Sequence, residues 1–128
     1  MQPKKIGIGI VAIIVIGIIA ASVGGSSGGA PSNAVVNNAP GSSTPGCEPD
    51  CFIPTTATIR TGGTITWMNG DTAAHTATAG TATGGPSGIF DSSLIMAGGS
   101  YSHTFEAVGV FDYFCMVHPW MSGVVIVR

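Results

Sequence analysis

After residue 46 the sequence consists of short runs of alternating or β-branched residues, separated by glycine-rich breaks. Examples of such runs are "GTITWMN", "SYSHTFE" and "GVVIVR". No stretch there keeps a 3.6-residue hydrophobic period over ten or more residues, as an amphipathic helix would. Six or more short strands with turns between them are typical of an all-β sandwich or barrel. We therefore expect an all-β domain.

The chain has 128 residues, which argues for at most one globular domain. We expect this domain to span residues 47–128. Residues 24–46 are rich in Gly, Ser, Asn, Ala and Pro and show no hydrophobic period. We therefore expect them to form a flexible linker in front of the domain.

The first segment, residues 1–23, contains two lysines followed by an apolar run without any charge, residues 6–23. As a helix this run would be roughly 27 Å long, close to the hydrocarbon thickness of a bilayer. It can be a membrane anchor whose lysines keep the N-terminus in the cytoplasm, or a signal segment that is cleaved. Of the two we favour the anchor. Either way we expect the domain outside the cytoplasm, anchored to the membrane or secreted.

From Cys47 onward there are six acidic and two basic residues, a net charge of −4. Nucleic-acid binding needs a basic surface, so we exclude nucleic acid as a partner. In an exported protein, Cys47 and Cys51 are expected to form a disulfide. The alternative is a pair of thiolate metal ligands, but no histidine follows within the next twenty residues. Cys115 is then left without a partner.

Cys115, His118 and Met121 follow one another at a spacing of three residues. Cys115 ends an apolar strand, so simple burial is one explanation for it. Thiolate, imidazole and thioether together favour copper, and two His and one Cys with a weak axial Met form a single-electron copper site. A second histidine is then needed. His75, at a loop-to-strand junction, and His103, within a predicted strand, are both candidates.

These motifs resemble those of the cupredoxins, the small blue copper proteins that include plastocyanin, amicyanin and the halocyanins. The resemblance extends from Ile53 to Arg128: "GTITWMNGDTAAHT" and "FDYFCMVHPWMSGVVIV" match the upstream histidine motif and the C-terminal ligand motif, in that order. It implies a Greek-key β-sandwich. It also implies one copper ion per chain, with His103 left as an ordinary strand residue and the ligands His75, Cys115, His118 and Met121.

By this resemblance the protein is a blue copper electron-transfer protein and not an enzyme; its single copper shuttles electrons between Cu(I) and Cu(II). Two residues depart from the pattern. Thr76 stands where several relatives carry Asn, although its hydroxyl can still hydrogen-bond across to the other ligand loop. Phe114 rather than His precedes Cys115, so the link to a trinuclear copper cluster is absent.

Two alternative functions are copper storage or delivery, and a copper-oxidase-related domain that lacks its second site. An oxidase needs several further histidines, and the chain has three in total; a copper store is expected to have clustered methionines, and the five here are scattered. As partners we expect redox proteins that dock near His118 and Trp120, with Trp120 either exposed there or folded into the core. We expect the protein to be a monomer.

Overall fold

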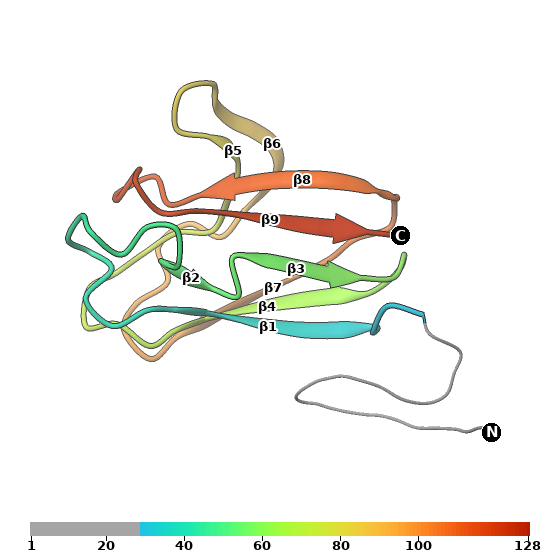
Figure 1. The fold of residues 1–128 in the computed structure, drawn as a ribbon, viewed down its shortest axis with the longest axis horizontal. Helices are drawn as coiled ribbons and strands as arrows, with labels where there is room; N and C mark the ends of the chain where they lie inside the picture. Colours follow the sequence, from blue (N-terminus) through green and yellow to red (C-terminus); the bar gives the residue numbers. More distant parts are fainter. Residues whose placement is uncertain (1–28) are drawn as a thin grey trace. The chain divides into compact units, whose positions relative to one another are not determined.

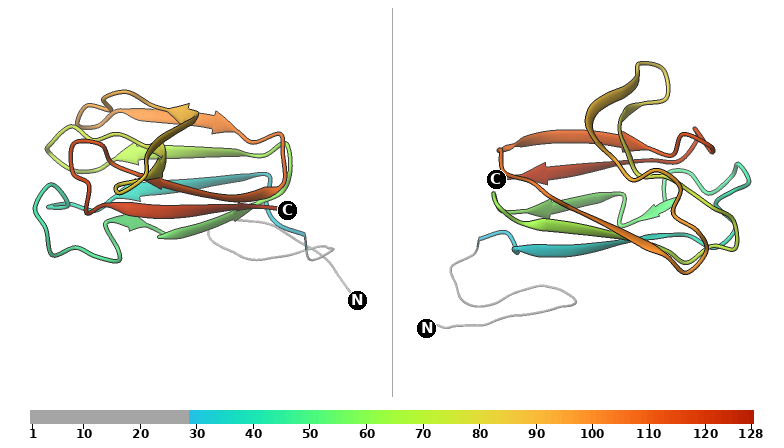
Figure 2. Two further views of the ribbon diagram at one scale, coloured as in Figure 1. Left: turned by 90° about the horizontal axis from the view of Figure 1, so that it is seen from above. Right: turned by 180° about the vertical axis from the view of Figure 1, so that it is seen from behind.

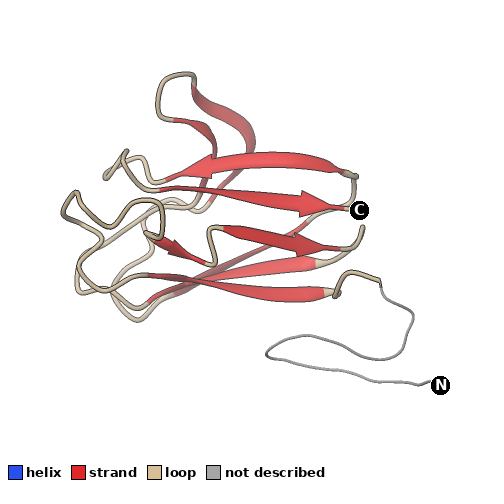
Figure 3. Cartoon of the chain, viewed as in Figure 1, coloured by secondary structure: helices blue, strands red, loops and turns tan. Residues whose placement is uncertain are grey.

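The computed structural model describes residues 29–128, and strands are the only regular elements in that part of the chain (Figures 1 and 3). In chain order the strands are β1 (Asn33–Asn38), β2 (Phe52–Ile53), β3 (Thr56–Ile59), β4 (Thr64–Asn69), β5 (Thr78–Thr81), β6 (Gly85–Asp91), β7 (Ser100–Thr104), β8 (Gly109–Phe114) and β9 (Ser122–Val127). Within residues 29–128 no helix is long and apolar enough to cross a membrane. The predicted membrane segment, residues 6–23, lies outside the described residues.

The strands form two sheets that face each other, as the two further views in Figure 2 show. One sheet has the order β2-β1-β4-β7 and the other has the order β3-β9-β8-β5-β6. The pairs β1–β4 and β3–β9 are parallel, and the remaining pairs are antiparallel. Strands that are far apart in the sequence thus lie side by side, as in a Greek key. The predicted all-β Greek-key sandwich is confirmed.

The core between the sheets is centred on Trp67, which is fully buried. In β4 the odd-numbered residues Ile65, Trp67 and Asn69 point into the protein and the even-numbered ones face outward, as alternation predicts. The Trp67 ring lies 5.3 Å from the rings of both Phe90 and Tyr113. Because these aromatic residues come from different sheets, their packing joins the two layers.

The prediction of a flexible linker over residues 24–46 is wrong for the second half of that range. Residues Asn33–Asn38 form β1, which pairs along its whole length with β4, and the compact unit begins at Pro31 rather than at residue 47. Only Val36 of the two adjacent valines is buried, so the side chains offer a weak strand signal. Parallel hydrogen bonding to β4 stabilises this strand, and its asparagine-rich sequence did not reveal that pairing.

Two further elements differ from the strand pattern in the sequence. Residues 52–60, "FIPTTATIR", are a further β-branched run in the sequence, and this run is divided at Pro54 into β2 and β3, which belong to different sheets. Strand β6 was not expected, because Gly85, Pro86 and Gly88 resemble a turn. It forms with β5 a hairpin that stands away from the sandwich in Figure 1.

A testable consequence concerns Gly123 in β9, which lies opposite Tyr113 in β8. A Cβ at position 123 would lie 2.5 Å from Cζ of Tyr113, whose ring is buried and cannot move aside. We expect Gly123→Ala to lower the free energy of unfolding by roughly 1–3 kcal/mol, as overpacking does. The matched control is Gly70→Ala, whose Cβ would meet no atom closer than 3.4 Å. Equal denaturant midpoints for the two variants would contradict the proposed role of Gly123.

Candidate metal centre

Three side chains from two separate segments meet at one end of the sandwich. His75 follows β4, while Cys115 and His118 belong to the loop between β8 and β9. The Sγ atom of Cys115 lies 3.8 Å from Nδ1 of His75 and 3.6 Å from Nδ1 of His118. The two Nδ1 atoms are 3.1 Å apart. One sulfur and two imidazole nitrogens therefore point at a common position.

The spacing of these atoms suits a bound metal ion. Bonds from a metal such as zinc to imidazole nitrogen or thiolate sulfur are about 2.0–2.3 Å, so two donors to one ion lie within about 4.6 Å of each other. All three distances meet this limit. His75 and Cys115 are fully buried, and so is Met121, the fourth residue of the predicted set. Together with Met121 the three donors form a type 1 copper-like site.

The loop that carries three of these residues is closed by its own backbone. The Met121 N–H donates to the His118 carbonyl at 2.9 Å, and the Cys115 N–H donates to the Met121 carbonyl at 3.1 Å. The antiparallel strands β8 and β9 enter and leave the loop as neighbours. The short spacing in the sequence thus becomes a tight turn that holds Cys115 and Met121 on its inner side.

His103, the other candidate for the second histidine, lies elsewhere. It belongs to β7, where its ring is 5.0 Å from that of Phe90 and 4.7 Å from that of Phe105. Burial lowers its pKa from the usual value. His103 is therefore a partly buried strand residue that packs against aromatic side chains, as expected.

Thr76 connects the two segments that carry the donor residues. Its backbone N–H donates to Cys115 Sγ at 3.3 Å, and its Oγ1 accepts a hydrogen bond from the Met116 N–H at 2.9 Å. The second contact is the hydroxyl bond expected for threonine at this position. The first one places a hydrogen-bond donor on the sulfur, which withdraws electron density from a thiolate and so adjusts its strength as a ligand.

Asp71 is a residue of the site that the sequence did not reveal. Its Oδ2 lies 2.7 Å from Nε2 of His75, and its Oδ1 accepts a hydrogen bond from the Gly41 N–H at 2.9 Å. Burial raises the pKa of Asp71, but the hydrogen bonds from Gly41, His75 and Thr72 outweigh burial and bring the pKa to about 2. Asp71 is therefore a carboxylate, and Nε2 of His75 must carry the shared hydrogen. Nδ1 of His75 is left with a free lone pair, as a metal ligand requires.

The position of Asp71 depends on Asn69 at the end of β4. The Asn69 side chain accepts the Asp71 N–H at 2.9 Å and donates to the carbonyls of Ala73 and Ile95 at 2.8 and 2.9 Å. His75 and Ile95 also exchange backbone hydrogen bonds. One buried amide thus orders the loop that leads to His75. The only signal in the sequence was an acid four residues before a histidine.

His118 lies nearer the surface than His75 and is partly exposed. Burial and the nearby His75 lower the pKa of His118, and the charge of Asp71 offsets part of this effect. The Trp120 ring lies 5.4 Å from the His118 ring. Trp120 is half-buried and packs against the edge of the core, so it lies between the two positions considered from the sequence.

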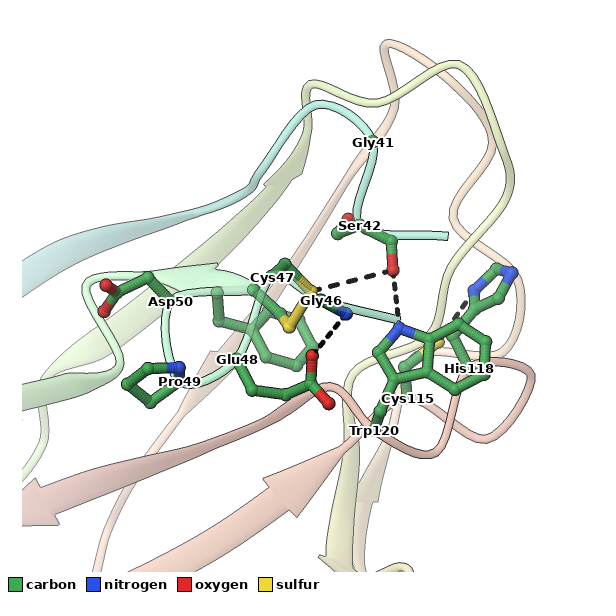
Figure 4. The surroundings of a disulfide bond; sticks show 12 residues. Gly41, Ser42, Gly46, Cys47, Glu48, Pro49, Asp50, Cys115, His118 and Trp120 are labelled. Atoms are coloured by element: carbon green, nitrogen blue, oxygen red, sulfur yellow. Dashed lines mark hydrogen bonds between the residues drawn. A yellow bond between two sulfur atoms is a disulfide. The ribbon is translucent and has the colours of Figure 1, made fainter. Parts of the chain in front are cut away.

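Cys47 and Cys51 form the expected disulfide, with Cα atoms 5.0 Å apart. The bond lies in the loop between β1 and β2, and Figure 4 shows it on the same side of the site as Trp120. The alternative of a thiolate metal pair at these positions is thus wrong, because each sulfur is bonded to the other.

Comparisons with known proteins agree with this geometry. Residues 50–128 match the family described as copper binding proteins, plastocyanin/azurin family. The amicyanin of Paracoccus versutus is 32% identical over 83 residues, which are 65% of this chain and 62% of that protein. Amicyanin-alpha of Methylorubrum extorquens is 30% identical over 70 residues, 55% of this chain and 58% of that protein. The chain thus spans less than two thirds of the length of these curated relatives.

Solved structures show the same fold. A purple cupredoxin from Nitrosopumilus maritimus superposes with a TM-score of 0.69 at 29% identity, over 74% of this chain and 99% of that one. The Cu(I) form of a mutant amicyanin superposes with a TM-score of 0.57 at 25% identity, over 77% of this chain and 85% of that one.

The Asp71 carboxylate predicts a specific dependence of stability on pH. Its pKa is lowered from 3.8 to about 2 in the folded protein, so the stabilisation is complete above pH 4 and is lost as the pH falls through 2. A shift of this size corresponds to about 2 kcal/mol.

In urea titrations of the copper-free protein between pH 2 and 5, Asp71→Asn should lose this part of the pH dependence. The control Asp112→Asn, at an exposed position, should keep the wild-type pH dependence. A wild-type slope in Asp71→Asn would show that the carboxylate is not held by these hydrogen bonds.

Proposed function

Because the chain belongs to the plastocyanin/azurin family of copper binding proteins, we propose that it carries single electrons on one copper ion. The proposed ligands are His75, Cys115, His118 and Met121. The observation that carries the proposal is the meeting of Cys115 Sγ with the two Nδ1 atoms, at mutual distances of 3.1–3.8 Å. Bound copper supplies the redox chemistry by alternating between Cu(I) and Cu(II).

The role of the protein in this function is to keep the metal-donor atoms in fixed positions. His75 and Cys115 are fully buried, and each is tied by hydrogen bonds, His75 to Asp71 and Cys115 to the Thr76 N–H and the Met121 carbonyl. Side chains held in this way cannot rearrange much when the charge on the metal changes. Small rearrangement favours fast electron transfer and suits a carrier better than a copper store, which must release its metal.

A copper oxidase is less well supported. The chain contains three histidines, and one of them, His103, packs between Phe90 and Phe105. Two histidines remain, and both are used by the proposed site. We therefore propose a carrier and not an enzyme.

We propose that partner proteins dock over His118 and Trp120. This end of the sandwich carries exposed apolar side chains next to the proposed ligands: Met116 and Val117 beside Cys115, and Leu94 and Met96 beside Ile95. A surface with many exposed apolar side chains excludes water readily and allows a brief, loosely specific contact. Of the two proposed ligand histidines His118 is the partly exposed one, so we propose that electrons leave through its ring.

We further propose that the domain works outside the cytoplasm, held at a membrane by residues 6–23 if these are retained. The apolar run of those residues supports an export or anchor segment. The Cys47–Cys51 disulfide supports an oxidising compartment.

The copper assignment is tested by Cys115→Ser. The purified protein should bind one copper per chain and show an intense visible thiolate-to-copper band, which Cys115→Ser should abolish. Met121→Leu is the matched control; it removes only the weak ligand and should keep the band while the reduction potential rises. A Cys115→Ser protein that stays strongly coloured would refute the assignment.

The docking surface is tested by electron self-exchange between two copies of the protein, measured by NMR line broadening. Val117→Asp places a like charge on both surfaces and should slow the exchange about tenfold, or about 1.4 kcal/mol. The effect should shrink at high salt, because exposed charges are screened.

Val108→Asp is the matched control, since Val108 is also exposed but precedes β8, whereas Cys115 follows it. Equal slowing by both variants would mean that electrons do not leave through the His118 surface.

A further inference from the structure

The loop between β1 and β2, residues 39–51 (the 39–51 loop), reaches both histidines of the metal centre through adjacent residues. Gly41 contacts Asp71, which contacts His75, and Ser42 contacts Trp120, which lies against His118. Residues 39–46 of this loop belong to the predicted linker, and most of the loop precedes residues 50–128, which match the family.

The branch to His75 is a chain of two hydrogen bonds. The Gly41 N–H donates to Oδ1 of Asp71 at 2.9 Å, and Oδ2 of Asp71 accepts from Nε2 of His75 at 2.7 Å. Gly41 has φ of +82°, so its N–H is aimed by a backbone conformation that favours glycine. The carboxylate is thereby held at both oxygens, and it fixes the hydrogen of His75 on Nε2.

The branch to His118 passes through an indole ring. Trp120 Nε1 donates to the Ser42 carbonyl at 2.9 Å, and Figure 4 shows this hydrogen bond with His118 next to the Trp120 ring. The rings of Trp120 and His118 are 5.4 Å apart. The hydrogen bond to Ser42 therefore holds the indole beside the His118 ring.

The 39–51 loop is itself held in place. The Ala39 N–H donates to the Cys51 carbonyl at 2.9 Å, and the Cys47–Cys51 disulfide closes its second half. Ser42 is fully buried, and Cys47 Sγ lies 3.9 Å from its carbonyl oxygen. The carbonyl that accepts the Trp120 N–H is thus in contact with the disulfide.

We propose that the disulfide-closed 39–51 loop is a positioning element of the metal centre, which fixes the tautomer of His75 through Asp71 and restrains the His118 ring through Trp120. The expected effects on copper rest on the proposed copper site, whereas the positioning of the two histidines does not. The alternative is that the loop merely covers the end of the sandwich.

Two single variants separate the branches. Asp71→Asn keeps the size of the side chain, but the single amide oxygen cannot accept from both the Gly41 N–H and His75 Nε2, and the negative charge is lost. Cu(II) should therefore bind less well than in the wild type, and the reduction potential should rise. Mutation of a residue that hydrogen-bonds a ligand histidine typically lowers metal affinity at least tenfold. A tenfold loss of Cu(II) affinity corresponds to a rise of about 59 mV in the reduction potential. Trp120→Phe keeps a ring but loses the N–H, and Cu(I) release to the chelator bicinchoninate should be about tenfold faster.

The disulfide variant Cys47→Ala/Cys51→Ala tests the loop as a unit, and it should show both effects. The matched control is Ser42→Ala, which keeps the backbone carbonyl and removes a hydroxyl that has no hydrogen-bond partner among residues 29–128. This variant should keep the wild-type potential and rate of copper release. If the disulfide variant does not fold, the two single variants and the control still decide the outcome.

A readout without copper is the ¹⁵N spectrum of the histidine rings in the copper-free protein. His75 should show a single tautomer with hydrogen on Nε2 in the wild type and in Ser42→Ala, and averaged tautomers in Asp71→Asn. Wild-type spectra, potentials and release rates in all variants would overturn the positioning role. If the wild type binds no copper but the tautomer result holds, the copper proposal fails and the positioning role stands.

Discussion

The pairing of β5 with β8 leads directly into the two hydrogen bonds that Thr76 makes with Cys115 and Met116. These bonds join the segment that carries His75 to the loop that carries the other three proposed ligands. Without this junction the two segments would be independent loops, and their donor atoms would have no fixed separation. Within their sheet, β9 and β6 flank this pair on its two sides.

Rigidity of the site follows from buried polar contacts rather than from apolar packing alone. Asn69, Asp71 and Thr76 are all buried, and each makes hydrogen bonds that order one of the segments around the metal centre. A buried polar group without partners is unfavourable by several kcal/mol, so the hydrogen bonds of these three residues favour one arrangement of the segments. An arrangement of this kind suits a carrier, because it leaves the donor atoms little freedom to follow the charge of the metal.

The N-terminal part of the domain contributes more than its composition suggested. Strand β1 completes one sheet, and the 39–51 loop that follows it lies against the metal centre. Both depend on partners that are distant in sequence, β4 for the strand and Asp71 and Trp120 for the loop. The segment therefore extends the site beyond the region that matches the family.

The sequence by itself determined the fold class and three of the four proposed ligands. Alternation within short runs is a local property that follows from the two-residue period of a strand, and Cys115, His118 and Met121 lie within seven residues, so their proximity needed no fold. The choice between His75 and His103 needed the family resemblance, because both lie next to or within strands. Only the tertiary structure decided that β1 and β6 are strands and that Asp71 and Trp120 link the 39–51 loop to the two histidines. Each of these features consists of hydrogen bonds or ring contacts between residues far apart in the chain, and no local pattern records which distant backbone or side chain will be the partner.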